Sequence, residues 1–217
     1  MKWLAIILVL SVGFSACKKK NKDQKMTITG QVTDNSDNSG VAGAIVKIYY
    51  KPYQNGVFMT TYSLLTSTTA DGSGVYNFDI EKPSTSDFKF VVESSNYFST
   101  EKVVNPDNLS LDNTNTIDFS TDPSGTLSIH LKNNIPFDST DYFQFQTLGL
   151  NYSCSTCCSS TPVIRTGDVF DTTFSCSRYA KRYIKFTWFK TKNGVTTLKN
   201  DSVYCAQGTT TLLEVLY

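Results

Sequence analysis

Apolar and polar residues alternate in short segments along most of this chain, and turn-forming residues separate the segments. Residues 75–80 and 127–132 are clear examples, because every second side chain in them is apolar. A two-residue period places the apolar side chains on one face of a β-strand. No window has the 3.6-residue period of an amphipathic helix. The sequence therefore predicts an all-β protein.

The alternating segments form two series, separated by a turn-rich break, Asp-Pro-Ser-Gly, at residues 122–125. The first series predicts strands at residues 26–33, 44–50, 75–80, 88–93, 98–104 and 114–119, and one or two strands within residues 57–69. The second predicts strands at residues 127–132, 142–150, 184–189 and 209–217, with a hairpin turn at Asn193-Gly194. About seven short strands are typical of a β-sandwich. We therefore expect two tandem β-sandwich domains, at residues 26–120 and 121–217.

The N-terminus has the composition of an export signal. Lys2 supplies a positive charge, residues 4–10 form an unbroken apolar run, and residues 11–16 are rich in small side chains. A membrane-spanning helix needs about 20 apolar residues. The run is too short for that, and no later segment is long and apolar enough. The sequence therefore predicts a cleaved signal peptide at residues 1–16.

The stretch Phe14-Ser15-Ala16-Cys17 resembles the lipobox of bacterial lipoproteins. The resemblance implies cleavage before Cys17 and thioether lipidation of its sulfur, with several acyl chains giving stable attachment to a membrane. Residues 17–25 contain five lysines and no apolar residue beyond the cysteine, which predicts a basic, flexible tether. We expect a lipid-anchored protein of the bacterial envelope, at the outer membrane, facing the periplasm or the surface. Lipoproteins of the Bacteroidetes type can carry acidic residues after the cysteine as a surface-export signal, so this basic tether favours the periplasm.

Three motifs of the first predicted domain occur in a familiar order. Residues 30–34 read Gly-Gln-Val-Thr-Asp, residues 41–46 read Val-Ala-Gly-Ala-Ile-Val, and residues 70–78 read Ala-Asp-Gly-Ser-Gly-Val-Tyr-Asn-Phe. Over residues 26–120 the chain resembles the carboxypeptidase regulatory-like domain, which implies a prealbumin-like β-sandwich that is accessory to catalysis. Within the motifs we expect Gly43 to permit a close backbone approach, and Asp71-Gly72 to form a tight turn.

Five further cysteines all lie in the second predicted domain: Cys154, Cys157, Cys158, Cys176 and Cys205. Structural disulfides suit an oxidising envelope compartment. A thiolate metal site and a Cys-x-x-Cys redox pair are the alternatives. We favour disulfides, with at least one joining Cys176 or Cys205 to the cluster at 154–158. The odd number leaves one thiol that is free, buried or intermolecular.

The sequence offers no constellation of catalytic residues. His130 is the only histidine, and it falls on the polar side of its predicted strand, so we expect it to face solvent. Zinc peptidase chemistry draws on two or three His or Glu ligands. We therefore expect no enzyme, no cofactor and no bound metal. Residues 34–40 have several oxygen donors but not the EF-hand spacing, which favours a polar loop and leaves a weak calcium site as the alternative.

The charge and the loop composition limit which classes of function are expected. The net charge is +1, and removing Lys2 with the signal peptide leaves equal numbers of basic and acidic residues, which argues against a nucleic-acid partner. Loops rich in Asn, Ser, Thr and Tyr suit recognition. We expect a non-catalytic binding or scaffolding lipoprotein whose partner, besides the membrane, is an envelope protein or a glycan. The binding candidates are Tyr53, Asn55, Asn96 and Tyr97. The alternatives are a glycan-binding accessory of an outer-membrane uptake system and a thiol redox or metal-handling protein.

Overall fold

The computed structural model describes residues 25–149 and 158–217, and nearly all of their regular structure is β-strand, which confirms the all-β prediction. The predicted signal peptide, Cys17 and nearly all of the tether lie outside these residues. The first half contains β1 (Lys25–Asp34), β2 (Ile45–Gln54), β3 (Val57–Phe58), β4 (Ser63–Thr69), β5 (Val75–Glu81), β6 (Thr85–Glu93), β7 (Thr100–Val104), the 3-10 helix η1 (Pro106–Asn108), β8 (Asn115–Thr116) and β9 (Phe119–Thr121). The second half contains β10 (Ser124–Lys132), β11 (Tyr142–Thr147), β12 (Val163–Thr166), β13 (Asp171–Tyr179), β14 (Arg182–Lys192), β15 (Val195–Cys205) and β16 (Thr210–Leu216).

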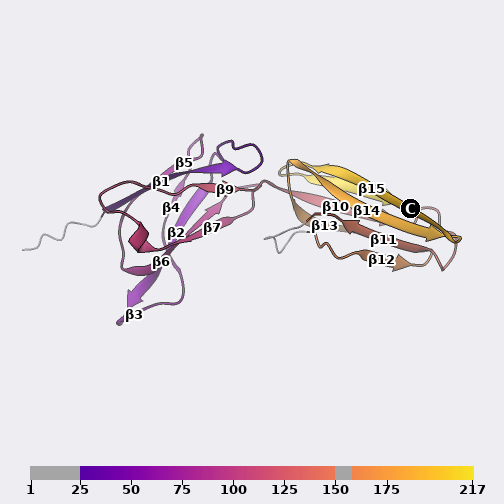
Figure 1. The fold of residues 1–217 in the computed structure, drawn as a ribbon, viewed down its shortest axis with the longest axis horizontal. Coiled ribbons are helices and arrows are strands. Elements are labelled where there is room, and N and C mark those ends of the chain that lie inside the picture. Colours follow the sequence, from indigo (N-terminus) through magenta and orange to yellow (C-terminus); the bar gives the residue numbers. More distant parts are fainter. Residues whose placement is uncertain (1–24, 150–157) are drawn as a thin grey trace, which may run out of the picture.

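The first half is a sandwich of two sheets (Figure 1). One sheet has the order β5-β1-β8, with β9 also paired to β1, and the other has the order β3-β2-β6-β7, with β4 also paired to β2. β1 runs antiparallel to β5 but parallel to β8 and β9. The inner faces of the two sheets bury a single hydrophobic core, which draws on residues from Met26 to Phe119.

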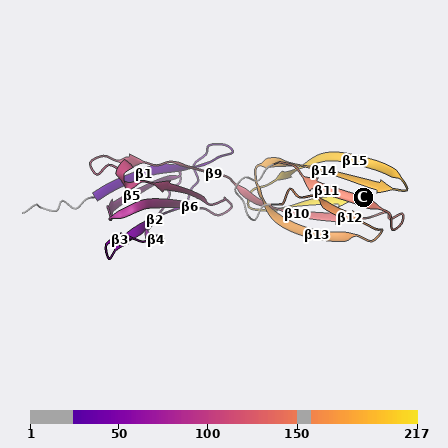
Figure 2. The same cartoon turned by 60° about the horizontal axis from the view of Figure 1, so that its bottom comes forward.

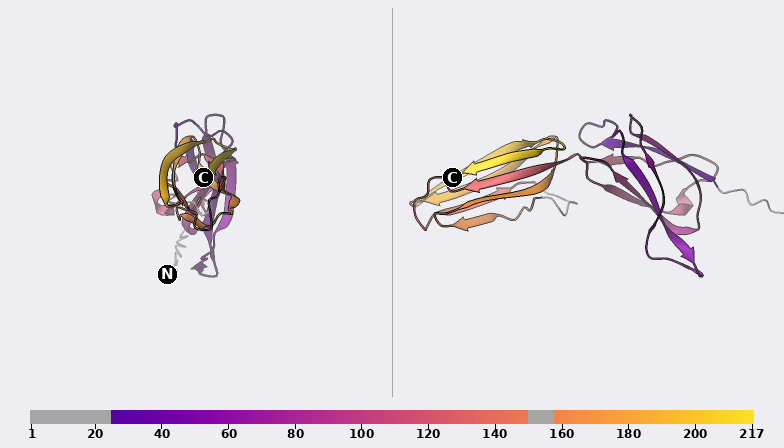
Figure 3. Two further views of the ribbon diagram at one scale, coloured as in Figure 1. Left: turned by 90° about the vertical axis from the view of Figure 1, so that its right-hand side faces the viewer. Right: turned by 180° about the vertical axis from the view of Figure 1, so that it is seen from behind.

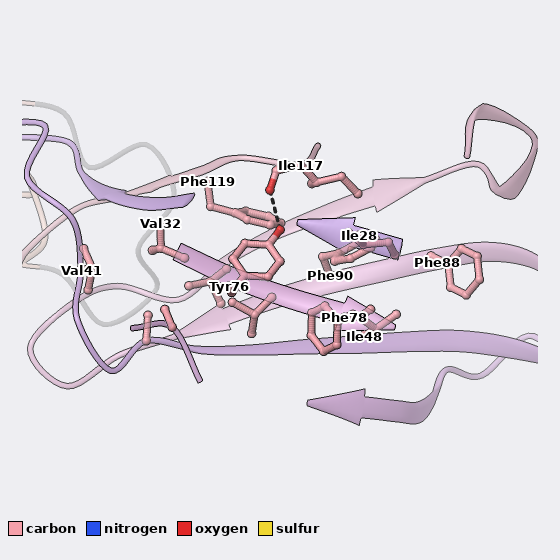
Figure 4. Close-up of a cluster of buried hydrophobic side chains, with 14 of the residues drawn as sticks. Ile28, Val32, Val41, Ile48, Tyr76, Phe78, Phe88, Phe90, Ile117 and Phe119 are labelled. Atoms are coloured by element: carbon pink, nitrogen blue, oxygen red, sulfur yellow. Dashed lines mark hydrogen bonds between the residues drawn. The ribbon is translucent and has the colours of Figure 1, made fainter. Parts of the chain in front are cut away.

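The predicted alternation accounts for this core. Ile28, Gly30 and Val32 share the buried face of β1, as the two-residue period requires. Figure 4 shows the hydroxyl of Tyr76, from β5, donating a hydrogen bond to the carbonyl oxygen of Ile117 within this cluster. The buried phenol therefore has a partner, as a polar group in a core requires.

The second half is also a sandwich of two sheets, with strand orders β13-β10-β16 and β12-β11-β14-β15. β10 lies antiparallel to β13 and parallel to β16. Leu127, Ile129 and Leu131 face a second core, as their alternation predicts. The predicted hairpin turn at Asn193-Gly194 joins β14 to β15, and both residues have positive φ, as a two-residue hairpin of this type demands.

The predicted strand at residues 114–119 is wrong in one respect, because the structure splits it into β8 and β9. Between them, the N–H of Ile117 still donates to the carbonyl of Thr29. The next hydrogen bond along β1 goes to a side chain, because the N–H of Gln31 donates to the Asp118 carboxylate at 2.8 Å. A carboxylate has replaced the backbone carbonyl, and the ladder is interrupted there.

Two expectations about glycines also need correction. Gly43 has φ of +72° and nothing within 4 Å of a Cβ built on it, so it supplies backbone conformation and not a close approach. The turn after Asp71 forms as expected, and its carboxylate accepts hydrogen bonds from two backbone N–H groups downstream. The residue that needs positive φ in this turn is Gly74, at +81°, and not Gly72.

The two sandwiches lie end to end, as Figures 1 and 2 show. Lys25 enters at the outer end of the first sandwich, and the chain ends near the outer end of the second (Figure 3). In the part of the chain that the structure describes, no helix is both long enough and apolar enough to cross a membrane.

Candidate functional site

The two sandwiches meet at a joint with almost no linker. Only Asp122 and Pro123 separate β9 from β10. The N–H of Phe98, from the first sandwich, donates to the Asp122 carbonyl at 2.9 Å, and the N–H of Ala180, from the second, donates to the Pro123 carbonyl at 2.7 Å. The rings of Phe98 and Tyr179 pack edge to face beside them, with centroids 4.9 Å apart. Both halves therefore hold the connecting pair.

An ion pair crosses the joint. Lys181 lies in the turn between β13 and β14 with φ of +56°, and its ammonium group lies 2.7 Å from a carboxylate oxygen of Asp34 and 2.7 Å from one of Asp37. The Asp34 side chain is fully buried. Burial by itself would raise the pKa of Asp34, but the hydrogen bond from Lys181 and those from neighbouring hydroxyls outweigh it and lower the pKa. The same two carboxylates raise the pKa of Lys181.

The carboxylate oxygens of Asp34 and Asp37, which a calcium ion would use as ligands, are therefore occupied by the Lys181 ammonium group. Asp37 also accepts hydrogen bonds from the backbone and hydroxyl of Ser39. These contacts favour the polar-loop interpretation over the calcium alternative. Within residues 25–149 and 158–217, no group of three or more His, Cys, Asp or Glu side chains is placed to hold a metal ion.

Two predicted binding residues lie in the joint. The carbonyl of Asn96 accepts hydrogen bonds from the N–H of Ser124 at 2.8 Å and from the side chain of Gln207 at 3.1 Å. The hydroxyl of Tyr97 donates to the buried carboxylate of Asp34 at 3.0 Å. Asn96 thus bonds to the second sandwich, whereas the hydrogen bond of Tyr97 lies within the first sandwich and supports Asp34, the partner of Lys181.

The other two predicted binding residues lie far from the joint. Tyr53 and Asn55 belong to the hairpin between β2 and β3, which projects from the first sandwich (Figure 1). Asn55 and Gly56 form its tip, with φ of +49° and +87°. The structure does not bring the four predicted residues into one site. It separates them into a joint and an exposed tip.

The described cysteines are not arranged as a reactive pair. Cys158 and Cys176 form a disulfide, which confirms the prediction of at least one such bond between Cys176 and the cluster. Cys205 is buried with a free thiol, and burial raises its pKa, so the sulfur is protonated at neutral pH and is a poor nucleophile. Cys154 and Cys157 lie outside the described residues.

His130 lies on the outer face of the second sandwich, as predicted, but it is held between two acids. Its Nε2 is 2.8 Å from a carboxylate oxygen of Asp171, on β13, and its Nδ1 is 3.0 Å from one of Glu214, on β16. Its side chain is only 23% exposed. The expectation of a solvent-facing histidine therefore needs correction, because both ring nitrogens have partners on the neighbouring strands.

We expect His130 to titrate above its ordinary pKa of 6.5. The hydrogen bond to Asp171, and then the one to Glu214, raise its pKa because they favour the charged ring. A raised pKa means that the imidazolium stabilises the fold fully below pH 6.5 and that this contribution is lost as the pH rises through the raised value. Proton NMR can follow the only imidazole directly, and Asp171→Asn should lower its pKa.

The matched control is Asp168→Asn, which removes an exposed carboxylate nearby and should leave the titration unchanged. A wild-type imidazole that titrates at or below 6.5 contradicts the prediction.

The fold and the joint together define a tandem β-sandwich protein whose two halves are held together by hydrogen bonds and an ion pair. No protein-family model matches the chain, and no curated protein matches it in sequence. Among solved structures, the Bacillus anthracis TIE protein is 12% identical with a TM-score of 0.36 over 88% of this chain and 34% of its own, so this chain spans about a third of its length. The shaft pilin SpaA from Lactobacillus rhamnosus GG is 9% identical, with a TM-score of 0.35 over 88% of this chain and 96% of its own. The major pilin SpaD from Corynebacterium diphtheriae is 10% identical, with a TM-score of 0.34 over 82% and 64%. Similarity this distant carries no argument about function.

Proposed function

We propose that this protein is a non-catalytic lipoprotein of the bacterial envelope that acts as a binding or scaffolding module. In this proposal Cys17 carries the lipid, residues 17–25 form the flexible tether, and the two sandwiches form one rigid unit that sets the distance from the first sandwich to the outer end of the molecule. The observation that carries the scaffolding role is the joint, above all the contact of Lys181 with the buried Asp34.

A fixed joint suits scaffolding because two domains on a free linker do not define a distance. Here the linker is two residues long and bonded on both sides, and an ion pair with one fully buried partner spans the boundary. The chain also enters at one outer end and finishes near the other (Figure 3). A partner that binds the second sandwich would therefore be held at a set distance from Lys25, where the tether joins the first sandwich.

The described chemistry-bearing side chains support binding over catalysis. His130 is held by two carboxylates, the Cys158 and Cys176 sulfurs are bonded to each other, and the Cys205 thiol is buried. General base and nucleophile roles need a group that can reach a substrate.

We further propose that the first sandwich is a domain of the carboxypeptidase regulatory-like kind. The support is the three motifs in order, together with the roles that two of them take in the fold. Gly30 of the first motif lies on the buried face of β1, and Asp71 of the third organises the turn before β5. Such a domain would be accessory, which agrees with a scaffolding role.

The lipoprotein part of the proposal is tested with Cys17→Ser in the full-length chain. We expect this variant to leave the membrane fraction, because a serine cannot form the thioether to lipid. Cys205→Ala is the matched control, since it removes a cysteine that is buried in the second sandwich and should leave the protein membrane-bound. Normal maturation of Cys17→Ser with retention in the membrane fraction would falsify lipidation.

The binding part is tested by cross-linking in the native envelope, followed by mass spectrometry. Reproducible recovery of an envelope protein or glycan with wild type, and its loss with Cys17→Ser, supports a membrane-held scaffold. Equal recovery with the released variant shows that the anchor is not needed for binding and counts against scaffolding.

A further inference from the structure

The hairpin between β2 and β3 carries a cluster of exposed apolar side chains. These are Tyr53, Val57, Phe58 and Met59, and Val57 and Phe58 are 61% and 46% exposed. The rings of Tyr53 and Phe58 contact each other with centroids 4.9 Å apart, and the N–H of Met59 closes the hairpin on the carbonyl of Pro52. The cluster is therefore a formed surface at a projecting tip. An exposed apolar surface of this kind marks a contact site.

The hairpin also lacks charge. No charged residue occurs between Lys51 and Asp71, which is unusual for a segment with so many exposed side chains. Lys51 itself is paired with Asp87 at 2.8 Å, at the base of the hairpin. The exposed tip thus combines aromatic and aliphatic side chains with uncharged polar ones, a composition suited to the boundary between water and lipid.

The register of the strands places this tip at the end of the sandwich where the chain enters. Lys25 pairs with Glu81 at the end of β5, and Pro52 pairs with Thr85 at the start of β6. Only three residues separate Glu81 from Thr85 along the chain. The hairpin continues beyond Pro52, and its tip projects sideways from the first sandwich near this end (Figure 1).

The length of the tether limits how far this end can lie from the membrane. The eight residues that follow Cys17 up to Lys25 reach at most about 30 Å when fully extended. Five of the residues from 17 to 25 are lysines, which are attracted to anionic headgroups by about 1 kcal/mol each. A short, attracted tether therefore keeps this end of the first sandwich close to the lipid surface, where the projecting tip can reach it.

We infer that the β2–β3 hairpin tip is a membrane-contact site that inserts Tyr53, Val57, Phe58 and Met59 into the interfacial region of the bilayer that holds the lipid anchor. This inference rests on the proposed attachment at Cys17. Together, anchor and tip give the first sandwich two points of contact with the membrane, which fixes its orientation as well as its distance.

The test holds the mature chain, residues 17–217, on vesicles by a polyhistidine tag placed before Cys17. The vesicles contain phosphatidylethanolamine, phosphatidylglycerol, a nickel-chelating lipid and a brominated phosphatidylcholine that quenches tryptophan. Because the tag provides the attachment, the result does not depend on whether cells lipidate Cys17. We expect Phe58→Trp to be quenched and its emission to shift to the blue.

The matched control is Leu198→Trp, since Leu198 is also exposed, at 63% against 46% for Phe58, but lies on β15 of the second sandwich. It should not be quenched, and neither should the native Trp188, which is buried. In a second arm, the triple change Tyr53→Ser, Val57→Ser and Met59→Ser in Phe58→Trp should reduce the quenched fraction about tenfold, because three apolar side chains no longer favour lipid.

Equal quenching of the two introduced tryptophans, or quenching of neither on loaded vesicles, overturns the inference. A blue shift of Phe58→Trp without vesicles that grows with protein concentration also overturns it, because the tip would then bind a second copy of the chain.

Discussion

Replacing Lys181 with methionine is expected to lower the free energy of unfolding by about 3 kcal/mol, because removing one partner of a buried ion pair leaves the other charge uncompensated. Methionine keeps the apolar stem of the side chain and removes only the charge. The Asp34 carboxylate would then remain fully buried with only hydroxyl and backbone partners. Asp37 adds little to the effect, because its side chain is 47% exposed.

Urea unfolding followed by circular dichroism measures the change, and Lys185→Met is the control. Lys185 lies on β14, the strand that follows the turn of Lys181, and its side chain is exposed, so its replacement should have little effect. Equal losses for the two variants would show that the joint does not depend on the ion pair.

The pH dependence provides a second check. Asp34 has a lowered pKa in the folded protein, so its contribution is fully present above the ordinary value of 3.8 and is lost as the pH falls through the lowered value. The difference in stability between wild type and Lys181→Met should shrink over that range. A difference that is constant down to the acid transition would indicate lost packing in place of lost charge.

Gly30→Ala is expected to destabilise the first sandwich by about 3 kcal/mol or more, because the added methyl group clashes with backbone atoms, and removing the clash requires the backbone to move. A Cβ at this position would lie 1.9 Å from the carbonyl oxygen of Ile117. That oxygen also accepts the hydrogen bond from the buried hydroxyl of Tyr76 (Figure 4). Relief of the clash therefore moves the backbone between β8 and β9 and breaks or strains this bond as well.

Gly72→Ala is the matched control, because nothing lies within 4 Å of a Cβ there and its φ is not positive. It should unfold within about 0.5 kcal/mol of wild type. Thermal unfolding followed by near-ultraviolet circular dichroism, which reports the aromatic core, separates the two. Similar midpoints for both alanine variants would mean that the close approach at Gly30 is not part of the folded state in solution.

The local period of the sequence identified strands that build both cores, but it predicted no strand at β12 (Val163–Thr166) or β13 (Asp171–Tyr179). Leu127, Ile129 and Leu131 face inward because a strand with one buried face must alternate, and Asn193-Gly194 turns because both residues tolerate positive φ. Where a side chain replaced a backbone partner, as Asp118 does beside β1, the period misplaced the strand ends.

The joint could not be predicted in the same way. Lys181 and Asp34 are 147 residues apart, and a lysine in a turn has no local feature that distinguishes a buried contact from an exposed one. Asn96 and Tyr97 have the composition of recognition loops, yet Asn96 bonds to the second sandwich and Tyr97 supports Asp34, the partner of Lys181. Contacts of this kind depend on where distant elements meet, and periodicity within one element does not report that.

The parallel pairing of β1 with β9 and of β10 with β16 has a mechanical consequence. The chain enters the first sandwich on β1 and leaves it on β9, and it enters the second on β10 and ends after β16. Tension applied between Lys25 and Tyr217 would pull the two strands of each pair in opposite directions along their length. The hydrogen bonds of each ladder would then bear the load simultaneously in shear, instead of opening one after another like a zipper. Resistance of this kind is governed by the rate of unfolding under force, so the molecule would extend little under tension before either sandwich ruptures.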